Sequence, residues 1–398
     1  MKILDAALYK TFKTLPAFPF ANLVRQHRAS ARLSREQFLA DRTIPQFVYH
    51  RLHQFDDVKY LESLQTVQDQ IASMPADDDI RVLYIEKLNE LHTRARLIGA
   101  MKQKDDFAVS VLADELFGTC VQTGVELADE FEALLVRSHT LHTHRPRIDA
   151  QRFEKMVRAT LDYYGLQHWN TRLVHRQSVS IARGESSARP PVVKIPKTLL
   201  LTKSRAARLL THEIEVHALR TANGMTSPIL LLGRGLAGYV ATDEGLALAM
   251  QRKIGTGASA MPGLWDAWAA ALSKEMDFRS CFEILYEARR KLNVALNIDD
   301  ADDAAFDSAW RLMMRVTRGI HHPNAAGLGF RRDHLYRSGL IEVQHAITRH
   351  GESAILPTLF AGHASLAHIP FLQSRGIVGR VPDFVGKGIV REVLKGGV

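Results

Sequence analysis

The chain contains 398 residues, 46% of them hydrophobic and 24% charged, which is the usage of an ordinary soluble globular protein and excludes a low-complexity chain. No stretch stays apolar for about 18 residues and no export signal is recognisable, so we expect a cytoplasmic protein with no membrane-spanning segment. The net charge of +9 suits an anionic partner or simple solubility, but the sequence lacks zinc-finger spacing and an aromatic RNA-binding signature, which disfavours nucleic-acid binding.

Helical periodicity dominates residues 1–149, which we predict to form an N-terminal helical region. Apolar residues recur at helical spacing in 77–91, and three acids crowd its first turn, where they complement the helix dipole. Further helices are predicted over 104–117 and 121–140. Residues 141–149 are predicted to connect this region to the remainder of the chain.

The pattern changes after a predicted helix over 150–164, which is expected to end at Gly165. Residues 178–183 and 192–196 alternate apolar and polar side chains, which predicts a short hairpin or two strands of a small sheet. Helical periodicity returns from Ser204 to the stop signal at 223–224 and dominates the rest, with a break at 323–329. The predicted fold class is therefore helix-rich α+β, with a small β-sheet beside helices.

The motif His-Glu-x-x-x-His at 212–217 has the residue types of a catalytic zinc site. Such a site needs neutral imidazoles as ligands, an open position for water, and a carboxylate beside that water as general base. The five-residue spacing separates His212 from His217 by about 140° on a regular α-helix. Both can reach one ion only if the helix carries a π-type bulge or ends between them, so we predict an irregular helix there. The alternative is a pair of surface histidines near a solvated glutamate.

A third ligand is available in Glu244, which begins another apolar helix. Thr242 is a predicted N-cap, which would place Glu244 in the first helical turn. Glutamate on a second helix suits a site whose first helix supplies two histidines. The alternative is that Glu244 only complements the helix dipole.

The chain resembles the tyrosine/phenylalanine carboxypeptidase domain family, which contains microtubule-associated tyrosine carboxypeptidase-like zinc metallopeptidases and bacterial members. The resemblance covers about residues 150–375. Bacterial members often have glutamine before the Glu-Gly-Leu-Ala run, where this chain has Asp243. The matching segments are His212-Glu213-x-x-x-His217, Asn223-Gly224, Gly233 to Tyr239, Glu244-Gly245-Leu246-Ala247, Arg315-Val316-x-Arg318-Gly319, and Phe330-Arg331-Arg332-Asp333-His334-Leu335-Tyr336-x-x-Gly339.

This resemblance implies a zincin-like metallopeptidase domain over 150–398 that binds one Zn²⁺ per chain. His212, His217 and Glu244 would be its ligands, and Glu213 the general base that later passes the proton to the leaving amine. The matching segments also contain arginines, whose planar fork suits the terminal carboxylate of a substrate. The candidates are Arg315, Arg318 and Arg332, while Tyr336 could donate its hydroxyl to the developing oxyanion. The alternatives are solvated or acid-paired arginines and a core tyrosine.

The function expected from these features is removal of a C-terminal residue, with tyrosine or phenylalanine implied by the resemblance alone, from a peptide or protein. An acidic C-terminal tail would suit the basic chain. Two alternatives stay open: a zinc endopeptidase or amidase with the same ligands, and a regulatory binding protein that keeps a metal site without catalysis. The paired histidines His345 and His350 lack a following glutamate and are expected to be structural.

Overall fold

The structure is a computed structural model that describes residues 3–138, 147–175, 178–182, 184, 190–254 and 262–395. The chain divides into two compact units. Unit 1 consists of Met1–Ala6, His144–Ser259 and Gly339–Val398, and unit 2 of Ala7–Thr143 and Ala260–Ser338. This division differs from the predicted boundary between 149 and 150, because the segment 260–338 packs with the N-terminal helices.

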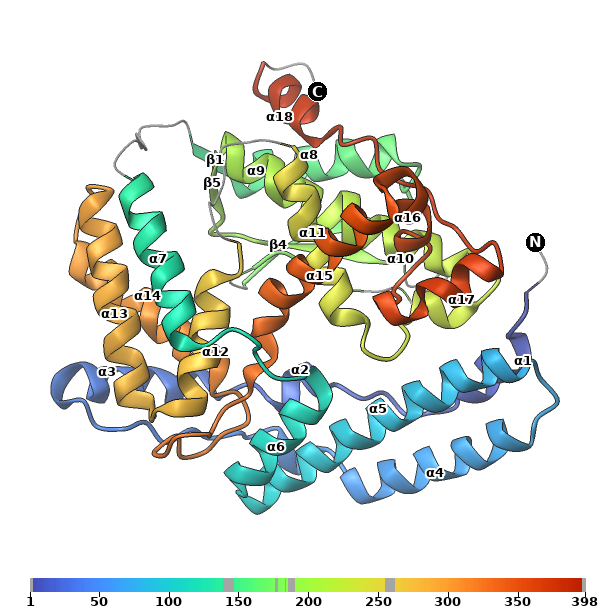
Figure 1. Ribbon diagram of the computed structural model, residues 1–398, viewed down its shortest axis with the longest axis horizontal. Coiled ribbons are helices and arrows are strands. Elements are labelled where there is room, and N and C mark those ends of the chain that lie inside the picture. The colour runs from blue at the N-terminus through green and yellow to red at the C-terminus, as the bar shows by residue number, and fades with distance from the viewer. Residues whose placement is uncertain are drawn as a thin grey trace. The chain divides into compact units, whose positions relative to one another are not determined.

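Unit 2 is built from helices that bury apolar side chains against one another. Helices α4 and α5 lie side by side and α5 packs on α6, while α12, α13 and α14 pack on one another and α12 and α13 also pack on α7 (Figure 1). Its helices are α1 (Ala6–Phe12), α2 (Phe20–Leu23), α3 (Arg28–Asp41), α4 (Asp57–Ser73), α5 (Asp78–Gln103), α6 (Asp106–Phe117), α7 (Gly124–Ser138), α12 (Leu264–Glu275), α13 (Phe278–Ala295) and α14 (Ala301–Val316), with 3₁₀ turns η1 (Leu52–Gln54) and η4 (Arg331–His334).

An aromatic cluster explains why 260–338 belongs with the N-terminal helices. The ring of Phe38 on α3 lies 4.7 Å from that of Phe282, 5.3 Å from Phe278 and 5.6 Å from Trp310, measured between centroids. Phe38 and Phe282 are fully buried. Aromatic side chains remove a large apolar area from water when they pack together, so this cluster joins the two segments of unit 2.

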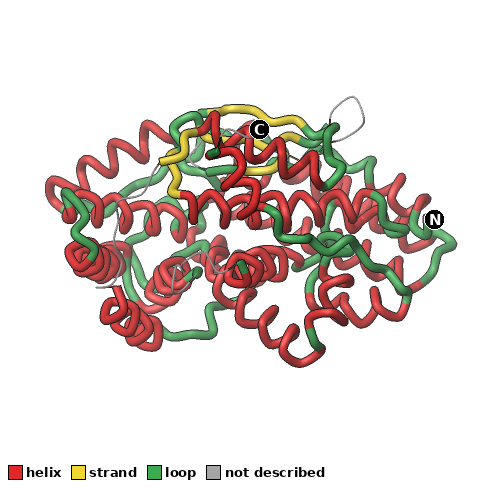
Figure 2. Tube along the Cα trace, turned by 90° about the horizontal axis from the view of Figure 1, so that it is seen from above, coloured by secondary structure: helices red, strands yellow, loops and turns green. Residues whose placement is uncertain are grey.

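Unit 1 contains the described strands, which lie together in Figure 2. In one sheet β2 runs parallel to β4, and β3 pairs antiparallel with the other edge of β4. A second pairing joins β1 antiparallel to β5. The strands are β1 (Arg147–Asp149), β2 (Asn170–Val174), β3 (Ser180–Ala182), β4 (Val192–Pro196) and β5 (Leu200–Thr202). The predicted small sheet is therefore present, although the loop between β3 and β4 lies largely outside the described residues.

The remaining elements of unit 1 are helical. They are α8 (Ala150–Tyr163), α9 (Lys203–Leu210), the π-helix η2 (Thr211–Ala218), α10 (Leu219–Met225), the 3₁₀ turn η3 (Leu230–Gly233), α11 (Tyr239–Lys253), α15 (Leu335–His350), which begins in unit 2, α16 (Glu352–Leu359), the 3₁₀ turn η5 (Leu366–His368), α17 (Ile369–Ser374) and α18 (Gly386–Leu394).

Helix α8 shows how local sequence sets these elements. Its N-cap Asp149 accepts a hydrogen bond from the backbone N–H of Arg152. Its buried residues Phe153, Met156, Val157, Thr160 and Leu161 follow helical spacing. The helix ends before Gly165, which has a φ of +77°. This agrees with the predicted helix end at that glycine. In the described ranges, no helix combines the length and apolar character needed to cross a bilayer.

Helices α11 and α15 cross at two glycines, Gly245 and Gly339. A Cβ atom on Gly339 would lie 2.0 Å from the carbonyl oxygen of Ala241, and one on Gly245 would lie 2.2 Å from the backbone of Gly339. These contacts are far inside van der Waals separation and involve backbone rather than a movable side chain. Both glycines come from segments of the family resemblance, and the crossing gives them a packing role.

We expect Gly245→Ala and Gly339→Ala each to lower the free energy of unfolding by at least about 2 kcal/mol, because a methyl group must displace backbone. Gly388 on α18 is the matched control, since nothing lies within 4 Å of a Cβ built there. Gly388→Ala should be neutral or stabilise by about 0.5–1 kcal/mol. Urea unfolding measures all three. Equal stability of the crossing and control variants would contradict the packing argument.

Candidate metal centre

The segment with the two histidines is a π-helix. Helix α9 runs without a break into η2 (Thr211–Ala218), which continues as α10. In a π-helix each hydrogen bond spans five residues, so residues five apart come to the same face. The imidazole rings of His212 and His217 accordingly lie 4.7 Å apart between centroids. The predicted irregularity between these residues is confirmed.

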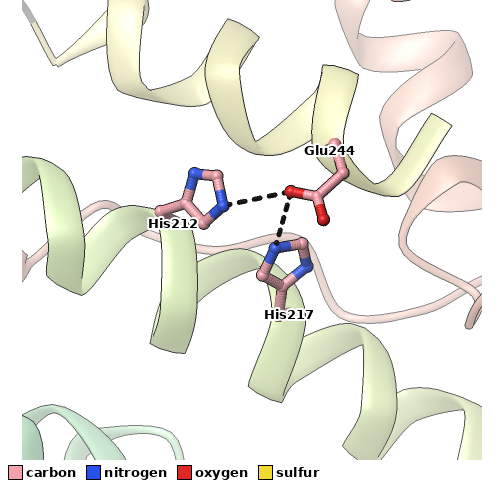
Figure 3. Close-up of side chains that lie close together, drawn as sticks. All are labelled: His212, His217 and Glu244. Atoms are coloured by element: carbon pink, nitrogen blue, oxygen red, sulfur yellow. Dashed lines mark ion pairs between the residues drawn. The ribbon is translucent and has the colours of Figure 1, made fainter. Parts of the chain in front are cut away.

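Glu244 joins the two histidines from the neighbouring helix α11 (Figure 3). Its Oε2 atom lies 3.4 Å from Nε2 of His212 and 3.6 Å from Nε2 of His217. One nitrogen from each histidine and one oxygen of Glu244 lie within 4.8 Å of one another. All three side chains are half-buried. The structure therefore brings together the three residues that were predicted as ligands.

The predicted N-cap Thr242 is wrong. Helix α11 starts at Tyr239, after Gly238 with a φ of +64°, so Glu244 lies in its second turn. Thr242 is buried inside the helix, and its hydroxyl accepts a hydrogen bond from the backbone N–H of Leu366. The hydroxyl therefore serves another segment of unit 1 instead of its own helix.

The donor set fits a catalytic zinc ion. Two imidazole nitrogens and one carboxylate oxygen are the protein ligands of many such sites, which leave a position for water. Burial would raise the pKa of Glu244, but His212 and His217 outweigh it and lower that pKa. Glu213 follows the first histidine and is half-buried, and burial raises the pKa of its carboxyl against the opposing effect of both histidines.

Each histidine is held from its other ring nitrogen. Nε2 of Gln251, on α11, lies 2.9 Å from Nδ1 of His212. Oδ2 of Asp243 lies 3.0 Å from Nδ1 of His217. A carboxylate such as Asp243 favours the tautomer and ring orientation of a metal-binding histidine, whereas the amide nitrogen of Gln251 is a donor and holds only the position of the His212 ring. Gln251 had a signal in the sequence, because it follows Glu244 by seven residues and so shares its helical face.

Glu215, also in the π-helix, is fully buried, and its carboxylate is bound by residues other than the three candidate ligands. Its Oε2 accepts a hydrogen bond of 2.5 Å from the hydroxyl of Thr211. Its Oε1 accepts bonds of 3.1 Å from the hydroxyl of Tyr164 and from the backbone N–H of Gly386. These bonds tie the π-helix to α8 and to the start of α18. Sequence reasoning did not identify Glu215 as an anchor of this segment.

The predicted substrate-binding arginines lie together in unit 2, around the buried Asp333 and the half-buried Asp266. Nε of Arg315 lies 2.7 Å from Asp333, and its Nη1 lies 2.9 Å from Asp266. Arg318 and Arg332 approach Asp333 at the longer distances of 3.5 Å and 3.6 Å. Three positive and two negative charges leave one positive charge in excess.

The pKa values of the two acids in this cluster are shifted in opposite directions. Burial raises the pKa of Asp266 to about 6 against the opposing effect of Arg315. Burial also opposes ionisation of Asp333, but Arg318 and Arg315 outweigh it and lower its pKa. Tyr336, at the start of α15, belongs to the same cluster, since the guanidinium carbon of Arg315 lies 5.6 Å from its ring centroid.

Other residues of the resemblance have structural roles. The side-chain amide of Asn223 donates to the carbonyls of Phe360, at 2.8 Å, and Arg380, at 2.9 Å. A Cβ atom on Gly224 would lie 2.6 Å from the carbonyl oxygen of Leu232. These residues join the end of α10 to the segments that pack on it.

A model of the microtubule-associated tyrosine carboxypeptidase family matches residues 36–258 and 270–385. The match covers most of the chain and extends well into the N-terminal helical region, where no motif was recognised in the sequence. No curated protein matches the chain significantly.

Proposed function

Because the chain belongs to the microtubule-associated tyrosine carboxypeptidase family, we propose that it is a zinc-dependent carboxypeptidase. It would bind one Zn²⁺ per chain and release one residue at a time from the C-terminus of a peptide or protein. The observation that carries this proposal is the convergence of His212, His217 and Glu244 from two elements, with Glu213 beside the first ligand.

The reaction needs water activation and a proton shuttle. When bound, zinc would polarise the scissile carbonyl and acidify a water molecule. The carboxylate of Glu213 would take the proton of the attacking water and pass it to the leaving amine. The half-buried surroundings of this carboxylate limit competing hydration, which strengthens its electrostatic effect on the reacting groups.

An acidic polypeptide tail is the substrate class that the charge of unit 1 supports. Unit 1 has 25 lysines and arginines against 13 acids, a net charge of +12, whereas unit 2 has 27 against 30. The positive charge of the protein is therefore concentrated in the unit that contains the candidate ligands. A field of this sign raises the rate at which acidic chains are captured. The family name makes a C-terminal tyrosine the first residue to test, with phenylalanine next.

Within the arginine cluster, we propose Arg318 and Arg332 as the groups that bind the terminal carboxylate. Arg315 already has Nε and Nη1 engaged by two acids, so its role is better explained as holding Asp333 and Asp266 in place. The hydroxyl of Tyr336 would then donate to the developing oxyanion.

Kinetic and stability measurements distinguish substrate binding by Arg318 from a structural role of Arg315. Arg318→Gln should raise KM about 10-fold or more with a smaller change in kcat, because a charge-assisted hydrogen bond to the substrate is lost. Arg315→Gln should instead lower the free energy of unfolding by roughly 2 kcal/mol, because two largely buried acids lose their closest partner. Steady-state kinetics and urea unfolding of both variants give the comparison. A wild-type KM in Arg318→Gln would remove that residue from the substrate site.

Peptide cleavage with metal analysis on one preparation tests the function. The protein is incubated with acidic peptides that end in Tyr, Phe, Leu or Glu, and with C-terminally amidated copies, and the products are weighed. We expect loss of a single C-terminal residue, fastest from Tyr or Phe, and little reaction with the amidated copies. A zinc-loaded protein that shortens none of the peptides would refute the exopeptidase assignment, and internal cuts would indicate an endopeptidase.

A further inference from the structure

Asp243 is held between a candidate metal ligand and two other side chains. Its Oδ2 atom lies 3.0 Å from Nδ1 of His217. Its Oδ1 atom lies 2.5 Å from Nη1 of Arg220 and 3.1 Å from Nδ1 of His363. The carboxylate is largely buried; it is hydrogen-bonded to Arg220 and His363 and lies close to the ring of His217.

Arg220 has little freedom to move away from Asp243. Its side chain is fully buried, Nε donates to the carbonyl of Gly362 at 2.9 Å, and Nη2 donates to that of Ala364 at 3.0 Å. Backbone carbonyls therefore bind Nε and Nη2 of the guanidinium group, while Asp243 binds Nη1. The positive charge of Arg220 also balances the negative charge of Asp243, so this buried pair is neutral as a unit.

His363 links Asp243 to Thr221, which contacts the backbone of His217. Its Nε2 atom lies 2.8 Å from the hydroxyl of Thr221, which in turn lies 2.8 Å from the backbone carbonyl of His217. The network therefore contacts His217 at its ring and at its backbone. Buried polar groups with satisfied partners specify one geometry, because any displacement leaves a group without its hydrogen bond.

These contacts determine the orientation and tautomer of the His217 imidazole ring. Oδ2 of Asp243 lies 3.0 Å from Nδ1 of His217 without a hydrogen bond between them, and its negative charge favours a proton on Nδ1. The lone pair then lies on Nε2, which is 3.6 Å from Glu244, as metal binding requires. At the equivalent position, Nδ1 of His212 lies beside the neutral amide of Gln251. The support of the two histidines is therefore unequal, and the charged support belongs to His217.

We propose that Asp243, held by Arg220, is a positioning residue that fixes the tautomer and rotation of His217 for metal binding. This inference rests on the proposed zinc site. A positioning role requires that loss of the Asp243 carboxylate weakens metal binding more than it weakens the fold. Replacement of such partners in zinc proteins typically costs 10- to 100-fold in metal affinity.

The test is zinc affinity, measured by competition with a chromophoric chelator, for the full-length wild type and Asp243→Asn. We expect about 10- to 100-fold weaker binding in the variant. Substitution of Co²⁺ gives a second readout, and its visible spectrum should change in Asp243→Asn because the orientation of one ligand changes. The double variant Arg220→Gln with Asp243→Asn guards against loss of fold, because it leaves no unpaired buried charge, and it should show the same weakened affinity.

Asp5→Asn is the matched control. Asp5 is also a buried acid of unit 1, and it accepts hydrogen bonds from the backbone N–H groups of Leu230 and Leu231. This variant should bind zinc as the wild type does. Wild-type affinity and an unchanged Co²⁺ spectrum in both Asp243 variants would overturn the positioning role. Failure of the wild type itself to bind zinc would refute the proposed function instead.

Discussion

Replacing Glu213 with glutamine is expected to lower kcat by about 100- to 10,000-fold while zinc remains bound. Glutamine keeps the volume of the side chain but cannot accept the proton of the attacking water. The three candidate ligands are untouched, so metal content should stay at that of the wild type. Turnover of a peptide ending in tyrosine, together with elemental analysis of the same sample, measures both quantities.

Glu392→Gln is a suitable control, because Glu392 is exposed on α18 and should leave kcat unchanged. Retention of wild-type turnover by Glu213→Gln would show that another group serves as general base. Loss of zinc from the same variant would instead show that Glu213 contributes to metal binding.

Removing the carboxylate of Glu244 should abolish activity by a different route. Structural zinc sites with four ligands bind with about 10–16 kcal/mol, or roughly 2.5–4 kcal/mol for each ligand. Glu244→Ala should therefore weaken zinc binding by about 100- to 1,000-fold, and activity should return only at high free zinc. Chelator competition and activity measured over a range of free zinc check both parts.

Glu342 on α15 provides the control for this variant, because it is an exposed glutamate of unit 1 that the proposed metal site does not use. Glu342→Ala should bind zinc as the wild type does. Equal zinc affinity in Glu244→Ala and Glu342→Ala would show that the ion is held by a different set of residues.

The convergence of the candidate ligands was largely predictable from local sequence. The residue types of His212, Glu213 and His217 indicated the chemistry, and their spacing was incompatible with a regular helix, which left an irregular segment as the consistent solution. Periodicity was also sufficient for long helices such as α5, whose acidic first turn follows the N-cap Asp77. Local signals worked where the deciding interactions lie within a few residues of one another.

Other features depend on contacts between distant segments. His363 reaches Asp243 across 120 residues, and no periodicity marks it. Helix α11 starts after Gly238, which has a left-handed conformation. Thr242 is the better capping residue by type, but its hydroxyl accepts a hydrogen bond from the backbone N–H of Leu366. Aromatic packing between helices far apart in the chain explains which segments form unit 2. Tertiary contacts therefore overrode local preferences at these points.

At the proposed site, the π-helix should make zinc binding depend on the folded state of unit 1. A peptide containing only residues 203–225 would favour an ordinary α-helix, which turns His212 and His217 to different sides. The unfolded chain should therefore bind zinc far more weakly than the native protein. Free zinc at 100 times its Kd would then stabilise the native state by about 2.7 kcal/mol. Scarcity of the metal would reduce the amount of folded protein in the cell as well as its activity.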